Sequence, residues 1–414
     1  MTSPNVASGV SPIPLESGPP PLSLYIHIPW CVRKCPYCDF NSHEVQGALP
    51  EADYVSAVLR DLDHEAHRIE GREVQTIFVG GGTPSLLSGE AVRSLLSGVR
   101  ARIKVAAPAE VTLESNPGSV DGPRLVDYQE AGVNRLSIGV QSFRAPQLAA
   151  LGRIHSGDDA LRAFETARRA GVSNINLDLM FGLPDDDVGG CLADLAQAMA
   201  LGPEHLSWYQ LAIEPNTAFY RHPPRLPDDD QVFAAYQAGR ALLRNHGYLQ
   251  YEVSAYARQG AECRHNRNYW EFGDYLGIGA GAHGKLSDLA NRRVVRNAKR
   301  AKPLSYMNGS YSNSAGSPAA IVEGSPLTAA QLTVEFMMNA LRLAAGFPLS
   351  LFTARTGLPI AAIESTLQEA RERGLIEVQG DWLTPTEWGY RYLNELVYLF
   401  YRDEPDPPRG AAAS

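Results

Sequence analysis

Short β-branched or aromatic segments alternate with longer helical segments through most of the chain, and this alternation constrains the fold more than any other feature. Apolar residues at three- and four-residue spacing predict helices between the strands. We read the strands as nearly continuous apolar runs, which is typical of a parallel sheet covered by helices. The predicted strands are 23–28, 76–80, 111–114, 135–140, 174–180 and 206–213, and the predicted helices are 54–69, 91–103, 161–170, 191–201 and 232–245.

Periodicity alone leaves two α/β architectures open, a doubly wound open sheet and a partial (β/α)6 barrel. Polar or unusual residues follow or end five of the six strands and lie within the fifth, and this distribution favours the barrel, whose site is built on the rim formed by the strand ends. An open sheet would concentrate them near one switch point. They are Cys31, Cys35 and Cys38 after the first strand, Gly80, Gly81 and Gly82 after the second, Glu114, Gln141, Asp178 and Glu214.

The remaining chain divides by composition. A Pro/Ser/Gly-rich leader at 1–21 is predicted to be disordered, and the barrel core occupies 22–247. An irregular extension at 248–302 is followed by a linker at 303–326 that is rich in Ser, Gly, Pro and Asn. Helical segments and a predicted hairpin at 327–402 indicate a small winged-helix-like α+β domain, and 403–414 is predicted to be a disordered tail.

Charge and composition exclude several classes of protein. The net charge of −9 argues against a general nucleic-acid-binding surface, so we expect no nucleic-acid partner and a structural or docking role for the winged-helix-like domain. Five cysteines are too few for a disulfide scaffold in a chain of 414 residues. No apolar run is long enough to span a membrane, and the leader lacks a signal sequence. We therefore expect a cytoplasmic protein.

The three clustered cysteines carry the strongest chemical signal. Cys31, Cys35 and Cys38 have the spacing C-x3-C-x2-C. Three soft thiolates on one loop suit three corners of an iron–sulfur cluster, and the fourth iron is left open because position 40 is Phe. Zinc completed by Cys263 or His265 is the alternative metal site, and three ordinary buried cysteines is the other alternative.

C-x3-C-x2-C after the first strand of a βα barrel resembles the radical S-adenosylmethionine (SAM) superfamily. The resemblance implies a [4Fe–4S] cluster on Cys31, Cys35 and Cys38, with S-adenosyl-L-methionine chelating the fourth iron. A reduced cluster in that superfamily cleaves the cofactor to release a 5′-deoxyadenosyl radical. The second-strand motif GGGTP matches the segment that meets the methionine ammonium, and Glu114 of LESNPG matches a polar contact to the cofactor.

The motifs SLYIHIPWCVRKCPYCDFNSH, IFVGGGTPSLL, LESNPG, NRLSIGVQSF, LGRIH and NLDLMFGLP, together with the tail, resemble the HemN-like branch of the superfamily. The resemblance implies cofactor contacts at several positions and leaves one or two bound SAM molecules open. The implied contacts are Tyr25, Gly81, Gly82, Thr83 and Glu114, with Gln141, Arg153 and Asp178 lining the cleft where the coproporphyrinogen III oxidases of this branch bind a second cofactor.

Two departures argue against coproporphyrinogen III dehydrogenation. Those oxidases carry a further cysteine where this chain has Phe40, and they have a longer region before the cluster motif. The segment His265–Trp270 instead reads HNRNYW, so the sequence is similar to the HemW-type haem chaperones of the branch. That similarity implies haem as cargo and haem-acceptor proteins, such as membrane respiratory enzymes met peripherally, as partners; a homodimer is also allowed.

The residues of this segment leave two interpretations open. His265 offers an imidazole for haem iron, Tyr269 and Trp270 offer flat faces, and Arg264 and Arg267 offer charges for the propionates. Alternatively, His265 braces the fold and the aromatic residues belong to the core. His283 in GAHG is a further candidate that faces either haem or the SAM cofactor.

Overall fold

The computed structural model describes residues 18–119, 121–288, 293–309 and 321–401. Most of the predicted leader and all of the predicted tail lie outside these residues. Within them, no helix has both the length and the apolar character needed to cross a bilayer.

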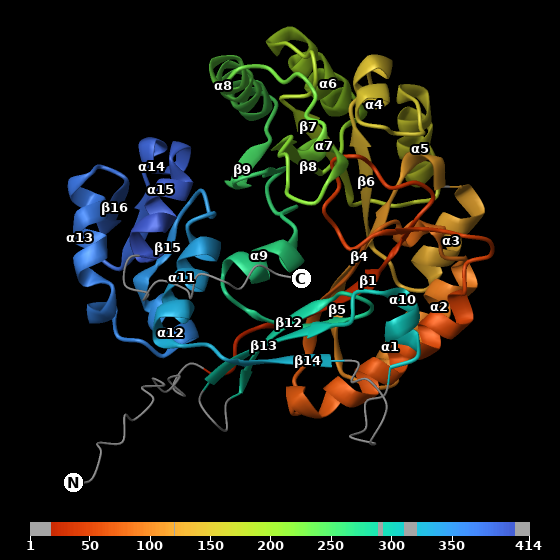
Figure 1. Ribbon diagram of the computed structural model, residues 1–414, viewed down its shortest axis with the longest axis horizontal. Helices are drawn as coiled ribbons and strands as arrows, with labels where there is room; N and C mark the ends of the chain where they lie inside the picture. Colours follow the sequence, from red (N-terminus) through yellow and green to blue (C-terminus); the bar gives the residue numbers. More distant parts are fainter. Residues whose placement is uncertain (1–17, 120, 289–292, 310–320, 402–414) are drawn as a thin grey trace.

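Six parallel strands, adjacent in chain order, form the centre of a twelve-stranded sheet (Figure 1). The sheet curves into a half-barrel and confirms the partial (β/α)6 prediction over the open sheet. Its first strand also pairs in parallel with β11 (Asp274–Ile278) on its other side. The six strands are β1 (Leu22–Ile28), β4 (Val74–Gly81), β5 (Val105–Ser115), β6 (Arg135–Gln141), β7 (Ile175–Phe181) and β8 (His205–Gln210).

Helices cover the outer face of the half-barrel (Figure 1). Local sequence explains their starts: α5 begins with a capping box in which Ser156 and Asp159 each accept a hydrogen bond from the other's backbone N–H. The covering helices are α1 (Glu51–Glu65), α2 (Gly89–Arg100), α3 (Gly122–Glu130), α4 (Ala145–Ala150), α5 (Gly157–Arg169), α6 (Val188–Leu201) and α8 (Asp229–Asn245).

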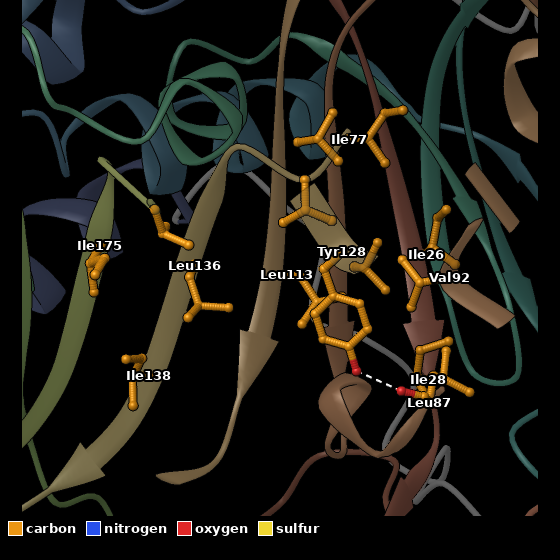
Figure 2. Close-up of a cluster of buried hydrophobic side chains, with 14 of the residues drawn as sticks. Ile26, Ile28, Ile77, Leu87, Val92, Leu113, Tyr128, Leu136, Ile138 and Ile175 are labelled. Atoms are coloured by element: carbon orange, nitrogen blue, oxygen red, sulfur yellow. Dashed lines mark hydrogen bonds between the residues drawn. The ribbon is translucent and has the colours of Figure 1, made fainter. Parts of the chain in front are cut away.

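The two faces of the half-barrel differ in polarity, which corrects our reading of the strands as nearly continuous apolar runs. Figure 2 shows apolar side chains of neighbouring strands packed in one layer, with Tyr128 of α3 donating a hydrogen bond to the carbonyl oxygen of Leu87 at 2.5 Å. Alternate residues point to the concave face and are polar, because this face lines the site rather than packing against helices. They include Tyr25, Glu114, Ser137, Asp178 and Tyr209.

Antiparallel strands extend the sheet at both edges. At one edge, β11 continues into β12 (His283–Asp288), β13 (Arg293–Lys299) and β14 (Ile321–Pro326); at the other, β10 (Ala255–Ala257) and β9 (Leu249–Glu252) form a hairpin. Within the segment 303–326, which was predicted as a linker, α10 (Pro303–Met307) forms and β14 pairs with β13, while 310–320 lies outside the described residues. The outer edge of a strand carries N–H and C=O groups that need hydrogen-bond partners, and a further strand such as β14 supplies them. Amino-acid composition does not reveal this pairing.

The C-terminal domain has a core of its own beside the half-barrel, built around Phe336, Phe347 and Phe352 (Figure 1). Phe272 and Val294 of the extension pack into the same core. A salt bridge of 2.9 Å between Arg342 and Glu252 links the domain to β9. Its elements are α11 (Ala329–Ala340), β15 (Phe347–Pro348), α12 (Leu349–Thr356), α13 (Glu364–Glu372), β16 (Ile376–Gln379), β17 (Trp382–Pro385), α14 (Glu387–Arg391) and α15 (Leu393–Tyr398).

Candidate functional site

The three clustered cysteines occupy one loop at the mouth of the half-barrel. Cys31 ends β2 (Trp30–Cys31), and the backbone N–H of Cys38 donates to the carbonyl oxygen of Cys35 at 3.1 Å, closing a tight turn. The loop returns through β3 (His43–Glu44), which pairs in parallel with β2. All three thiols are free and partly exposed.

One cavity of about 320 Å³ brings this loop together with nearly every residue that the sequence singled out. The residues come from five strands and the connections after them, which is the rim arrangement expected for a barrel site. We name this space the cluster cavity; its predicted members are Cys31, Cys35, Cys38, Gly81, Gly82, Thr83, Glu114, Gln141, Arg153 and Asp178.

Polar side chains approach each thiol. Thr83 Oγ1 donates to Cys31 Sγ at 3.5 Å, and Arg153 Nη1 donates to Cys35 Sγ at 3.7 Å. Burial raises the pKa of Cys31, and that of Cys38 likewise. Hydrogen-bond donors beside the sulfur atoms offset the burial of negative charge, so three soft donors that share one cavity fit an iron–sulfur cluster.

The zinc alternative loses its proposed fourth ligands. Cys263 is buried and its thiol lies 3.6 Å from Glu110 Oε1, while His265 is buried in another layer, and neither lines the cluster cavity. In the described part of the chain, no three His, Cys, Asp or Glu side chains gather around a point that a single ion could occupy. The donor set therefore suits a cluster better than a single zinc ion.

The glycines after β4 present an open backbone edge to the cavity. Gly81 has φ of +120°, a conformation that favours glycine, and a Cβ there would come within 2.6 Å of the His27 ring. A Cβ on Gly82 would approach the carbonyl oxygen of Trp30 to 2.5 Å. The N–H of Gly81 donates to Glu114 Oε2 at 2.9 Å. A ligand can thus approach this edge closely.

Two carboxyl groups lie on the floor of the cluster cavity. Burial, and next the nearby carboxylate of Asp178, raise the pKa of Glu114 to about 8. Burial also raises the pKa of Asp178, although Asn176 and Ser137 donate hydrogen bonds to it at 2.8 and 3.2 Å. A cationic ligand, such as an ammonium or sulfonium group, would favour the ionised form of both.

Arg153 and Gln141 are held in place by Asn116 and Tyr209, which were not among the predicted site residues. Arg153 donates to Asn116 Oδ1 and, at 2.7 Å, to the carbonyl oxygen of Gly139, rather than pairing with Asp178. The hydroxyl of Tyr209 donates to Gln141 Oε1 at 2.7 Å. Asn116 stands in the LESNPG motif and Tyr209 near the end of the sixth strand, so their positions at strand ends were the signal that would have found them.

Tyr25 lines a second, adjoining cavity of about 720 Å³. The two cavities meet at four shared residues: Asp39, Phe40, Gly81 and Glu114. The second cavity also contacts the C-terminal domain through Asn339 of α11. Tyr25 shares the lining of this second cavity with Gly81 and does not line the cluster cavity.

The HNRNYW segment forms α9 (Arg264–Trp270), which lies between the half-barrel and the C-terminal domain (Figure 1). The N–H groups of Arg264 and His265 donate to Glu110 at 3.1 and 3.0 Å. Asn268 donates to Ser23 Oγ and to the carbonyl oxygen of Asp274, both at 2.9 Å. Through these bonds, α9 is held against β5, β1 and β11.

His265 is 1% exposed and lines neither cavity. Its ring nitrogens make hydrogen bonds with Thr76 Oγ1 at 2.8 Å and with the Tyr269 hydroxyl at 2.9 Å. Arg264 and Arg267 also lie outside both cavities, and Arg267 pairs with Glu271 on the surface. In this conformation the geometry favours the bracing interpretation of His265, while Tyr269 and Trp270 do line the second cavity.

Comparisons with known proteins agree with this geometry. Residues 25–195 match the Radical SAM superfamily, and residues 327–392 match the HemN C-terminal domain. A solved structure of the coproporphyrinogen III oxidase HemN from Escherichia coli superposes with a TM-score of 0.78, covering 93% of this chain and 91% of that one. At 23% identity, that likeness shows the fold alone. Fold and cysteine loop together define a radical SAM protein with a HemN-type C-terminal domain.

Sequence relatives show to which family of radical SAM proteins the chain belongs. Heme chaperone HemW of Escherichia coli (strain K12) is 52% identical, covering 92% of this chain and 98% of its own length. Heme chaperone HemW of Haemophilus influenzae is 44% identical over 93% of this chain, and that of Bacillus subtilis (strain 168) is 33% identical over 91%. The chain belongs to the heme chaperone HemW family, which confirms the resemblance drawn from the motifs.

Proposed function

We propose that this chain is a haem-trafficking protein. It holds a [4Fe–4S] cluster on Cys31, Cys35 and Cys38, binds SAM beside the cluster, and carries haem to haem-requiring proteins. The observation that carries the proposal is the meeting of ten predicted site residues in the cluster cavity of a chain that is 52% identical to a heme chaperone HemW.

In this proposal, different residues around the cluster cavity contact different parts of SAM. Gly81 and Gly82 give the backbone edge that the methionine part approaches, and Glu114 offers a carboxylate for an ammonium or hydroxyl group. Arg153 neutralises charge beside Cys35, and Gln141 and Asp178 offer hydrogen bonds deeper in the cavity. A reduced [4Fe–4S] cluster held by these residues would supply the electron for cleavage of the sulfonium C–S bond of SAM.

Haem is the cargo in this proposal. The names of the relatives support it, and the second cavity offers room beside the cluster cavity. We further propose that the acceptors include membrane respiratory enzymes, which the protein meets peripherally from the cytoplasm. The exposed aromatic side chains Trp382 and Trp388 give the C-terminal domain a surface for docking to protein partners.

The test is a haem-transfer assay. Anaerobic reconstitution should give about four irons per chain with a broad absorbance near about 400 nm. Haem-loaded protein, with and without the cluster, is then mixed with an apo-haem protein, and transfer is followed by the acceptor's spectrum. We expect transfer that depends on the cluster. Bound haem that never reaches the acceptor would contradict the carrier role, and turnover of coproporphyrinogen III with reductant and SAM would favour an oxidase instead.

A further inference from the structure

The second cavity, defined above, has the size and shape of a small-molecule site. Its volume of about 720 Å³ lies within the range of ligand pockets, roughly 300–1,000 Å³. Its lining residues come from β1, the cysteine loop, α9, the strands β11, β12 and β13, and α11 of the C-terminal domain, besides Gly81 and Glu114. A ligand here would touch both domains and would border the cluster cavity at Gly81, Glu114 and Phe40.

Two imidazoles line this cavity, and they differ in the availability of their nitrogens. His27 Nδ1 is hydrogen-bonded to the Tyr25 hydroxyl, and His27 Nε2 is hydrogen-bonded to the carbonyl oxygen of Asn41, both at 2.9 Å. His283, at the start of β12, is exposed to the cavity, and among the described residues its ring makes no hydrogen bond. Burial, and next the charge of Arg296, lower the pKa of His283.

The backbone holds His283 in place. A Cβ on Gly277 would come within 1.9 Å of the carbonyl oxygen of His283, so the two strands pack more closely there than any other residue would allow. Gly279 and Gly281 have φ of +100° and +81° and form the turn between β11 and β12. The histidine is thus presented on a short, ordered hairpin rather than on a loose loop.

Charge is distributed unequally in the second cavity. Asp39 and Glu114 stand where it meets the cluster cavity, while Lys285 and Arg296 stand among its other lining residues. Arg296 donates from Nε to Glu335 at 2.9 Å and uses one N–H each on Tyr275 and again Glu335, so two of its five donors have no partner among the described residues. Those donors suit a carboxylate of a ligand.

Aromatic rings are also among the lining residues of the second cavity. Tyr269 and Tyr275 meet edge to face with ring centroids 4.6 Å apart, and Trp270 and Tyr25 also line the cavity. A flat, largely apolar macrocycle bearing a metal ion and carboxylates matches the combination of a free imidazole, aromatic walls and an arginine with unused donors.

We propose that haem binds in the second cavity, with His283 as an axial ligand of the iron and Arg296 as a partner of a propionate. The inference rests on the haem-carrying function proposed above and assigns it to particular residues. It moves the iron ligand from the HNRNYW segment to the β11–β12 hairpin, while Tyr269 and Trp270 keep a packing role. It also places the cargo against the wall that the SAM-binding residues form.

The experiment is a titration of the cluster-loaded protein with ferric haem, followed by the Soret band and by resonance Raman or EPR spectra. His283→Ala should lose the histidine-ligated signature and bind haem at least about tenfold more weakly, a loss of the size of one strong contact. His283→Met should retain binding with a shifted spectrum. His246→Ala, a matched control at the exposed end of α8, should behave as the wild type.

Haem dimethyl ester, whose propionates carry no charge, tests the proposed contact between Arg296 and a propionate. Arg296→Gln should weaken haem binding about tenfold and leave ester binding unchanged, whereas Arg264→Gln on the exposed face of α9 should change neither. If His283→Ala does not fold, as judged by circular dichroism, the binding of haem and of its dimethyl ester to Arg296→Gln tests whether haem occupies the second cavity. An unaltered spectrum in a folded His283→Ala, or equal loss of haem and ester in Arg296→Gln, overturns the assignment. A wild-type protein that binds no haem overturns the proposed function instead.

Discussion

The side-chain amide of Asn41 donates to the carbonyl oxygen of Ala280 at 2.8 Å, which joins the cysteine loop to the turn between β11 and β12. A second bond from the same nitrogen reaches the carbonyl oxygen of Ala301 at 2.9 Å. Asn41 lies three residues past Cys38, and Ala280 lies three residues before His283. One side chain therefore connects the candidate cluster ligands with the candidate haem ligand.

Removing this connection should loosen the cysteine loop. We expect Asn41→Ala to lower the free energy of unfolding by about 1–2 kcal/mol, because two backbone carbonyls lose their donor. The reconstituted cluster should also lose iron faster to a chelator, measured by the decay of its visible absorbance. Asn245→Ala, at the exposed end of α8, is the control. Equal rates of iron loss in both variants would contradict the role assigned to Asn41.

The cluster assignment predicts a sharp division among the five cysteines. Serine at Cys31, Cys35 or Cys38 should reduce reconstituted iron to background, because each thiolate holds one corner of the cluster. Cys191→Ser should keep its iron, since that thiol is buried on α6 outside the cluster cavity. Iron and sulfide analysis of anaerobically reconstituted protein measures the effect. Iron retained by all three loop variants would refute the assignment.

Glu114 should make the apo-protein less stable as the pH rises. Its folded-state pKa of about 8 lies above the ordinary 4.5, so the folded protein binds an extra proton between these values. Its stabilising contribution is complete below about pH 4.5 and is lost as the pH rises toward 8. Glu114→Gln should therefore flatten this part of the profile and be more stable than the wild type at pH 8, by up to about 4 kcal/mol.

Urea unfolding between pH 5 and 8.5 measures this difference, with the exposed Glu377→Gln as the control. The same Glu114 variant should bind SAM more weakly by equilibrium dialysis, because the amide cannot balance a cationic ligand. A Glu114→Gln profile parallel to that of the wild type would show that the carboxyl group does not carry the pH dependence.

His265 should matter for stability rather than for iron ligation. We expect His265→Ala to cost about 2–4 kcal/mol, because it leaves a buried cavity and removes the partners of Thr76 and Tyr269. Burial lowers the pKa of His265 to about 3, so its contribution is present above about pH 6.5 and is lost as the pH falls toward 3. Chemical unfolding at pH 7 and pH 5 measures both effects.

The haem spectrum of folded His265→Ala separates the two interpretations of the HNRNYW segment. An unaltered Soret band agrees with a brace, whereas loss of the histidine-ligated signature in this variant, with His283→Ala unaffected, would return the ligand role to His265.

The amino-acid sequence by itself determined the parallel half-barrel and most of the cluster cavity. Alternating apolar periods are local properties, and they placed the six central strands within a few residues of their observed ends, except that β5 begins earlier. Residues that follow parallel strands must meet at one rim, so Cys31, Gly82 and Asp178 could be grouped before any coordinates were known.

Only the tertiary structure decided what surrounds that cavity. His265 and His283 look alike as candidate ligands in the sequence. In the structure, Thr76 and Tyr269 are hydrogen-bonded to the two ring nitrogens of His265, whereas His283 faces the second cavity. The polar concave face and the pairing of β14 with β13 also depend on segments that are distant in the chain. The physical reason is that burial and hydrogen-bond partnership are set by neighbours across the fold, which local periodicity does not encode.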